Sequence, residues 1–171
     1  ENVNGIAIRS MKEPGTAYDD PVLGRDPQPG HMDDYVVTVE DAGGVHINSG
    51  ILNHAFYLTA IELGGYAWEK AGQIWYTTSR DKLFGNADFN DFARLTHTTA
   101  GELYGIGSLE QQAVRFGWQE VGLSVGFVEE DNGGDNGNGD NDNPGGSNGA
   151  TNQPGCLDSL FTGFLFRRLF S

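Results

Sequence analysis

The feature of this sequence that most constrains its fold is a set of four apolar stripes between Asn48 and Gly122. In each stripe, apolar residues recur every three or four positions, which places them on one face of an α-helix. A single short helix is marginal in water unless its apolar face is buried, so the four stripes are predicted to share one core. The sequence therefore predicts a mainly α, bundle-like domain.

Glycines and capping residues give the expected ends of these helices. The first helix is expected to begin at Asn48 or Ser49. Asp88 is the expected N-cap of the third helix, and Ser108 is expected to form a capping box with Gln111 at the start of the fourth. The expected helices span 48–63, 66–78, 89–104 and 109–121.

Composition divides the chain into three parts, of which the first, residues 1–128, is the predicted helical domain. It opens with a long loop rich in proline and aspartate over 12–35, followed by β-branched residues at 35–40 that predict a strand or an extended lead-in. Residues 129–156 lack large apolar side chains and are predicted to be a disordered acidic linker. Residues 157–171 form the third part.

The third part carries apolar residues at helical spacing with Arg167 and Arg168 near its end, and so predicts a short amphipathic tail. It is too short to span a bilayer. It could lie on a membrane surface or bind a groove on a partner. The favoured interpretation is a segment that is removed by processing or that arises from a truncated or shifted reading frame.

Charge and cysteine content exclude several classes of function. The net charge of −14 and the absence of a basic stripe disfavour nucleic-acid binding. Cys156 is the one cysteine, so an internal disulfide and a cysteine-based zinc site are excluded. Because the chain begins with Glu1 rather than methionine, a fragment or a processed product is expected.

The residues with catalytic or metal-binding chemistry do not form a complete catalytic set. No two histidines have the H-E-x-x-H spacing of a helical zinc site, and no nucleophile elbow or phosphate-binding loop is present. His31, His54 and His97 are interpreted as structural or solvated residues. The aspartates at positions 19, 20, 26, 33 and 34 could bind calcium, but they lack EF-hand spacing, so a solvated loop is the favoured interpretation.

His46 differs from the other histidines because it follows Gly43 and Gly44, which allow a tight turn and close approach of a ligand. Asp41 lies five residues earlier and could accept a hydrogen bond from one imidazole nitrogen, which would fix the tautomer and favour the cationic ring. The other nitrogen could then donate to a developing oxyanion. The alternative is a histidine that simply packs at the start of a helix.

Residues 41–58, DAGGVHINSGILNHAFYL, closely resemble the signature of the helical domain of thermolysin-like peptidases. Three more blocks resemble that family in the same order: IRSM at 8–11, GGYAWEKAGQIWY at 64–76 and ELYGIGSLEQQAVRFGWQEVG at 102–122. The loop sequence GTAYDDPVLGRDPQP resembles that of the protealysin-like branch of the family. Ala42 departs from the pattern, which has asparagine there, and the acidic linker and the tail have no counterpart in it.

The resemblance implies the carboxy-terminal half of a secreted zinc endopeptidase that cleaves peptide or protein substrates. It implies that His46 stabilises the transition state, that Asp41 orients His46, that Arg9 binds the substrate and that Ile8 forms an apolar wall of the specificity pocket. It also implies that an amino-terminal domain of the same polypeptide holds the zinc, because no zinc ligands are found here. A different hypothesis is a non-catalytic helical binding module without its catalytic half.

Overall fold

The computed structural model describes residues 2–3 and 6–126 and contains four α-helices in this part of the chain. The predicted linker at 129–156, the predicted tail at 157–171 and Cys156 lie outside the described residues. The mainly α fold that the apolar stripes predict is confirmed. The helices are α1 (Asp41–Leu63), α2 (Ala71–Asp81), α3 (Phe89–Tyr104) and α4 (Leu109–Glu120).

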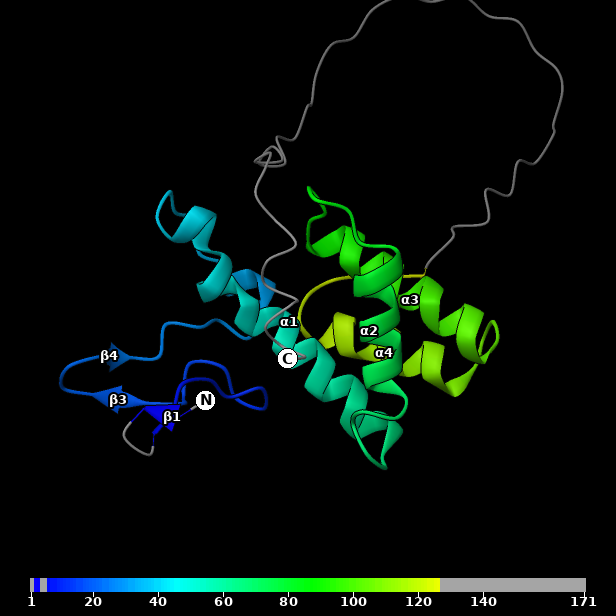
Figure 1. The fold of residues 1–171 in the computed structure, drawn as a ribbon, viewed down its shortest axis with the longest axis horizontal. Coiled ribbons are helices and arrows are strands. Elements are labelled where there is room, and N and C mark those ends of the chain that lie inside the picture. Colours follow the sequence, from blue (N-terminus) through cyan, green and yellow to red (C-terminus); the bar gives the residue numbers. More distant parts are fainter. Residues whose placement is uncertain (1, 4–5, 127–171) are drawn as a thin grey trace, which may run out of the picture.

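The four helices form a bundle in which α1 packs against α2 and α4, and α3 also packs against α2 and α4 (Figure 1). Two tryptophans lie at its centre. The rings of Trp75 from α2 and Trp118 from α4 stack with centroids 6.0 Å apart, and Phe92 of α3 meets both edge-on. Trp118 also donates a hydrogen bond from its indole nitrogen to Oγ1 of Thr96 at 2.9 Å, so its one polar atom is satisfied in the core.

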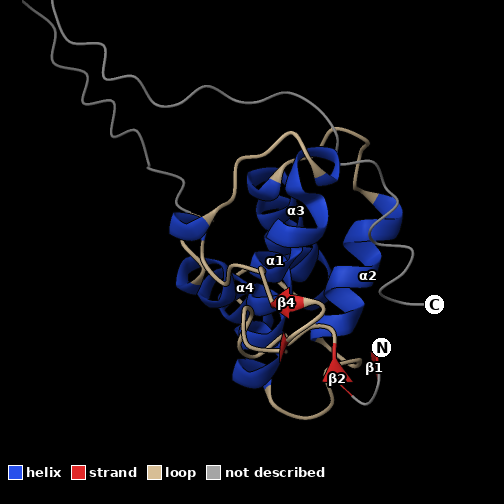
Figure 2. Ribbon diagram, turned by 90° about the vertical axis from the view of Figure 1, so that its left-hand side faces the viewer, coloured by secondary structure: helices blue, strands red, loops and turns tan. Residues whose placement is uncertain are grey.

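The segment before α1 lies beside the bundle, on the left in Figure 1 and toward the viewer in Figure 2. It contains two antiparallel pairs of two-residue strands and a 3₁₀ helix, η1. In this segment β1 pairs with β2, and β3 pairs with β4. Their bounds are β1 Asn2–Val3, β2 Ile6–Ala7, β3 Asp19–Asp20, β4 Gly24–Arg25 and η1 Met32–Asp34.

Residues 35–40 form an extended lead-in and not a strand. The side chain of Asn48 accepts a hydrogen bond from the Val36 amide and donates one to the Val36 carbonyl, both at 2.9 Å. One buried asparagine thus satisfies the backbone groups that a neighbouring strand would otherwise pair.

The predicted start of the first helix was wrong. The helix is assigned from Asp41, but Ala42, Gly43 and Gly44 have non-helical backbone angles, so regular helix begins after Gly44. His46 therefore lies in the first regular turn of α1 and not ahead of the helix. The sequence did not predict this start, because glycine has a low helix propensity and the segment is rich in glycine.

The second helix begins five residues later than predicted and ends three residues later. Residues 67–70 form turns, and the Gly72 amide donates to the Ala67 carbonyl, five residues back, at 2.7 Å. A side chain at Gly72 would meet that carbonyl oxygen at 2.9 Å, so the close turn requires glycine. The apolar periodicity continues through this turn, which is why the sequence pattern did not reveal it.

The third helix begins and ends as predicted, with a capping box between Asp88 and Asp91 and with Gly105 after its last residue. At the fourth helix only half of the predicted capping box forms. The Ser108 hydroxyl accepts from the Gln111 amide at 3.2 Å, but the Gln111 side chain accepts from Gly107 and donates to the His97 carbonyl. None of the helices in the described part of the chain is long and apolar enough to cross a membrane.

Candidate functional site

A left-handed turn at the start of α1 sets the geometry of the candidate site. Asp41, Ala42, Gly43 and Gly44 all have positive φ, from 49° to 85°. Gly44 is buried, and a Cβ there would lie 2.9 Å from Nδ2 of Asn48, so both its backbone angle and its surroundings require glycine. Asp41 and Ala42 adopt this conformation at a steric cost of about 1–2 kcal/mol each.

The turn brings the Asp41 carboxylate over the first regular turn of the helix. Oδ2 accepts from the backbone amides of His46 at 2.8 Å and Ile47 at 3.1 Å, and Oδ1 lies 2.5 Å from Nδ1 of the His46 ring. Asp41 thus caps the helix in the manner of an N-cap residue, although it lies several residues before the regular turn. A carboxylate at this end also interacts favourably with the helix dipole.

These contacts keep Asp41 ionised. Burial alone would raise its pKa, but the hydrogen bonds from the His46 side chain, the Ile47 amide and the His46 amide outweigh burial and lower the pKa below 3.8. An ionised carboxylate only accepts hydrogen bonds, so Nδ1 of His46 carries the proton in this contact.

The other edge of the His46 ring is open. The side chain of His46 is 61% exposed, whereas that of Asp41 is 23% exposed. Within the described residues, no group bonds to Nε2 of His46. When the ring carries two protons, Nε2 is a fixed donor aimed at solvent, and such a donor can stabilise an oxyanion that develops beside the domain.

The loop at 12–35 is docked on α1 and is less solvated than its composition suggested. The interpretation of its aspartates as solvated is wrong for Asp26, which is 4% exposed. The Asp26 carboxylate accepts from the amides of Gly15, Ala17 and Gln28 at 3.0 to 3.1 Å, and so folds the loop on itself. Gln28 then donates from Nε2 to the His46 carbonyl at 2.8 Å.

The sequence interpretation missed the contact of Gln28, and it considered Asp26 only as a possible calcium ligand in a solvated loop. The run Asp26-Pro27-Gln28-Pro29 restricts the backbone, which was the available signal for a built loop. Nothing local in that run indicates a contact with His46, 18 residues later.

The two other predicted site residues are not bonded to this pair. Ile8 and Arg9 follow β2, where Ile8 is partly buried and Arg9 is exposed. In the part of the chain that the structure describes, no hydrogen bond or ion pair joins Arg9 to Asp41 or His46. The structure therefore brings together one predicted pair, Asp41 and His46.

The remaining histidines make separate contacts. Nδ1 of His54 lies 3.0 Å from the Gly30 carbonyl oxygen, and Nδ1 of His31 accepts from the Asp33 amide at 3.1 Å. Burial lowers the pKa of His97, and the positive charge of Arg115 lowers it further. Each histidine thus occupies its own environment.

The donor set for a metal ion is missing from the described part of the chain. Among residues 2–3 and 6–126, no three histidine, cysteine, aspartate or glutamate side chains gather closely enough to hold a metal. The described residues thus offer no metal site of their own, and the five loop aspartates do not form a calcium cluster.

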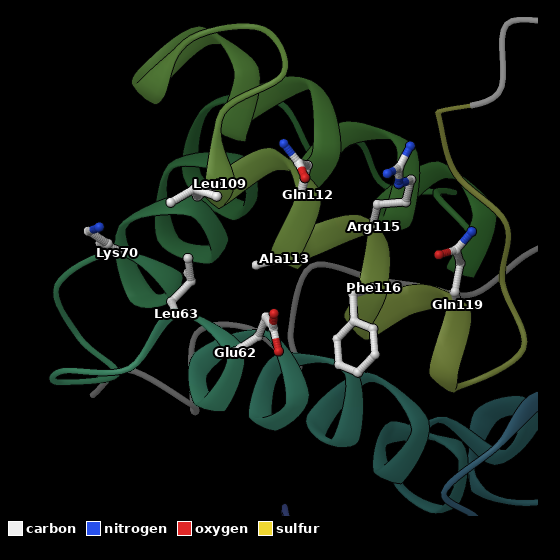
Figure 3. Close-up of a pocket in the computed structure, with 9 residues that line it drawn as sticks. All are labelled: Glu62, Leu63, Lys70, Leu109, Gln112, Ala113, Arg115, Phe116 and Gln119. Carbon is white, nitrogen blue, oxygen red and sulfur yellow. The ribbon is translucent and has the colours of Figure 1, made fainter.

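An open pocket of about 380 Å³ lies between the end of α1 and α4 (Figure 3). It is bounded by the last turn of α1, which provides Glu62 and Leu63, and by one face of α4, which provides Gln112 and Phe116. Glu62 follows His46 by 16 residues, a distance of about 24 Å along a helix. The pocket is therefore not part of the Asp41–His46 site.

Comparison with known proteins gives a consistent result. Residues 1–123 match the family described as "Thermolysin metallopeptidase, alpha-helical domain". An extracellular metalloprotease of Pectobacterium carotovorum is 54% identical over 128 residues, which are 73% of this chain and 36% of that protein. Protease PrtS of a Photorhabdus strain is 54% identical over 134 residues, which are 77% of this chain and 35% of that protein.

A solved structure is similar as well. The precursor of protealysin, a metalloproteinase from Serratia proteamaculans, has a TM-score of 0.65 and 56% identity, over 70% of this chain and 38% of that chain. The present chain thus spans about a third of the length of these three relatives.

Proposed function

Since this chain belongs to the thermolysin metallopeptidase family as its alpha-helical domain, we propose that it forms one side of the active site of a secreted endopeptidase. Peptide or protein chains are the proposed substrates. The names of relatives, an extracellular metalloprotease and an extracellular elastase among them, support an extracellular location and this reaction class.

The observation that carries the proposal is the contact between Asp41 and His46. In the proposed reaction, His46 donates a hydrogen bond from Nε2 to the oxyanion that forms when the substrate carbonyl is attacked. Asp41 holds the ring through Nδ1 and balances its positive charge. Fixed donors of this kind lower an activation barrier because they need no reorganisation as the charge develops.

Zinc binding, which the proposed reaction also needs, is assigned to a different segment of the polypeptide. The described residues contain no group of three metal ligands, so zinc is assigned to an amino-terminal domain of the same polypeptide. The small share of each relative that this chain covers supports such a division. The present chain alone is accordingly proposed to be inactive.

Arg9 and Ile8 are proposed to bind the substrate. The exposed guanidinium of Arg9 has no partner among the described residues and is free to donate to a substrate carbonyl. Replacement of Arg9 by methionine should raise KM more than it lowers kcat, and an unchanged KM would remove Arg9 from the site.

The test is a hydrolysis assay on two proteins: this chain alone, and this chain joined to a zinc-binding amino-terminal domain of the family, called here the joined polypeptide. We expect peptide hydrolysis from the joined polypeptide and none from the chain alone. A joined polypeptide that folds and binds zinc but does not cleave peptides would favour the helical binding module instead.

A further inference from the structure

The backbone amide and the backbone carbonyl of His46 are both held by side chains from outside the regular part of the helix. The His46 amide donates to Asp41 Oδ2, and the His46 carbonyl accepts from Gln28 Nε2, each at 2.8 Å. The contact with Asp41 also orients the ring, whereas the contact with Gln28 acts on the backbone alone. The two contacts together fix the base from which the imidazole projects.

We infer that Gln28 is a positioning residue for His46, which acts by anchoring the loop at 12–35 to the first turn of α1. This inference rests on the proposed function for its effect on rate. Its effect on the geometry of the Asp41–His46 pair does not depend on that function.

The loop contacts a single stripe of α1. Gln28 bonds to the carbonyl of His46, the Pro29 carbonyl lies against Gly50, and the Gly30 carbonyl faces the ring of His54. His46, Gly50 and His54 are spaced by four residues, which places them one above another on the same face. A Cβ on Gly50 would lie 2.5 Å from the Pro29 carbonyl oxygen, so glycine there allows the loop to approach closely enough for Gln28 to reach His46.

The hydrogen bonds of Gln28 show which group of its side chain holds His46. The residue is 6% exposed, and Nε2 donates to Oγ of Ser49 at 2.9 Å as well as to the His46 carbonyl. In the described part of the chain, Oε1 of Gln28 is buried and has no hydrogen-bond partner. An unsatisfied buried acceptor costs about 1–3 kcal/mol, so the favourable contribution of this side chain comes from its NH₂ group.

The loop is rigid enough to act in this way. Asp26 is buried and accepts from three backbone amides, one of them that of Gln28. Pro27 and Pro29 restrict the backbone on either side of Gln28. The amide group is therefore presented from a fixed support, and its loss should let the first turn of α1 shift relative to Asp41.

The test replaces Gln28 by methionine, which has a similar shape and no donor. The first measurement is the proton NMR resonance of Nδ1–H of His46, whose position and lifetime depend on the hydrogen bond to Asp41. It is recorded on the 171-residue chain. We expect the resonance in the wild type and its loss or a clear upfield shift in Gln28→Met.

The matched control is Gln111→Met. Gln111 also donates from Nε2 to a helical carbonyl, that of His97, at 3.2 Å, but it serves a different pair of helices. We expect Gln111→Met to lower Tm and to leave the His46 resonance in place. If both variants alter the resonance equally, or neither does, the role of Gln28 is structural only and the inference is overturned.

A second variant replaces Gln28→Met in the test if that variant does not fold. If circular dichroism shows that Gln28→Met is unfolded, Ser49→Ala takes its place, because the Ser49 hydroxyl accepts from Gln28 and itself donates to the His46 carbonyl at 2.8 Å. It should shift the same resonance to a smaller extent, and an unchanged resonance would again overturn the inference.

Kinetics of the joined polypeptide separate this inference from the proposed function. Gln28→Met should lower kcat by about tenfold to a hundredfold with KM little changed, as expected for a misplaced catalytic group. If His46→Ala leaves the rate unchanged while Gln28→Met still shifts the resonance, the proposed function fails and the positioning stands. If His46→Ala abolishes the rate while the resonance of Gln28→Met is that of the wild type, the positioning fails and the proposed function stands.

Discussion

The carboxylate of Asp41 binds both the ring and the backbone of His46, with Oδ1 2.5 Å from Nδ1 and Oδ2 2.8 Å from the amide nitrogen. One side chain thereby fixes the orientation of the imidazole and caps the helix that carries it. The left-handed turn at 41–44 is what allows both contacts, because it folds the chain back over the start of α1.

The Asp41 contacts make stability depend on pH. The pKa of Asp41 is lower in the folded chain than its usual value of 3.8, so the folded state is stabilised by its ionised form. This contribution is complete above about pH 3.8 and is lost as the pH falls through the lower folded pKa. We expect Asp41→Asn to have a lower Tm than the wild type at neutral pH. In acid, the difference in Tm between the two proteins should become smaller. Parallel curves of Tm against pH for the two proteins would contradict this account.

Ala42 is strained by its left-handed backbone, with φ 49° and ψ 45°. Ala42→Gly removes a steric cost of about 1–2 kcal/mol. Glycine also increases the conformational entropy of the unfolded chain, which destabilises the folded state by about 0.4–1 kcal/mol. We expect a gain of up to about 1.6 kcal/mol in the free energy of unfolding, measured by urea denaturation. Ala60→Gly, within the regular part of α1, is the control and should lose about 1 kcal/mol. A loss in both variants would argue against strain at Ala42.

Gly117 lies where α4 packs against the backbone of α1. A Cβ there would lie 2.6 Å from the Ala55 carbonyl oxygen and would also collide with Oγ1 of Thr59. Alanine favours a helix by about 1 kcal/mol over glycine, but overpacking against fixed backbone costs about 1–3 kcal/mol. We expect Gly117→Ala to lower Tm.

The control for Gly117 is Gly85→Ala, because a Cβ at Gly85 has no atom within 4 Å. That change should alter the free energy of unfolding by less than about 0.5 kcal/mol. Equal stability of the two variants would show that α1 and α4 can separate at little cost.

Sequence predicted the parts of this structure that depend on neighbouring residues. The start of α3 at Asp88 and its end at Gly105 follow from capping and from backbone freedom within a few positions. The proximity of Asp41 and His46 was likewise accessible, because they lie five residues apart across two glycines.

Contacts between distant residues could not be predicted in this way. The reach of Gln28 to His46 depends on the contacts of Asp26 with the amides of Gly15 and Ala17 and on the space beside Gly50, and these partners lie far from Gln28 in the sequence. The late start of α2 depends on a turn from Ala67 to Gly72 that keeps the apolar spacing of a helix. The periodicity of apolar residues indicates which face of a helix is apolar, but it does not indicate where the regular helix begins.

The most direct test of the central claim is the value of kcat/KM for peptide hydrolysis by the joined polypeptide with His46 replaced by alanine. Loss of an oxyanion donor typically costs about 100-fold to 1000-fold in rate, so we expect a fall of this size with bound zinc unchanged. His97→Ala, a histidine of α3 away from the site, should keep nearly the wild-type value. A His46→Ala enzyme that retains wild-type kcat/KM would contradict the account.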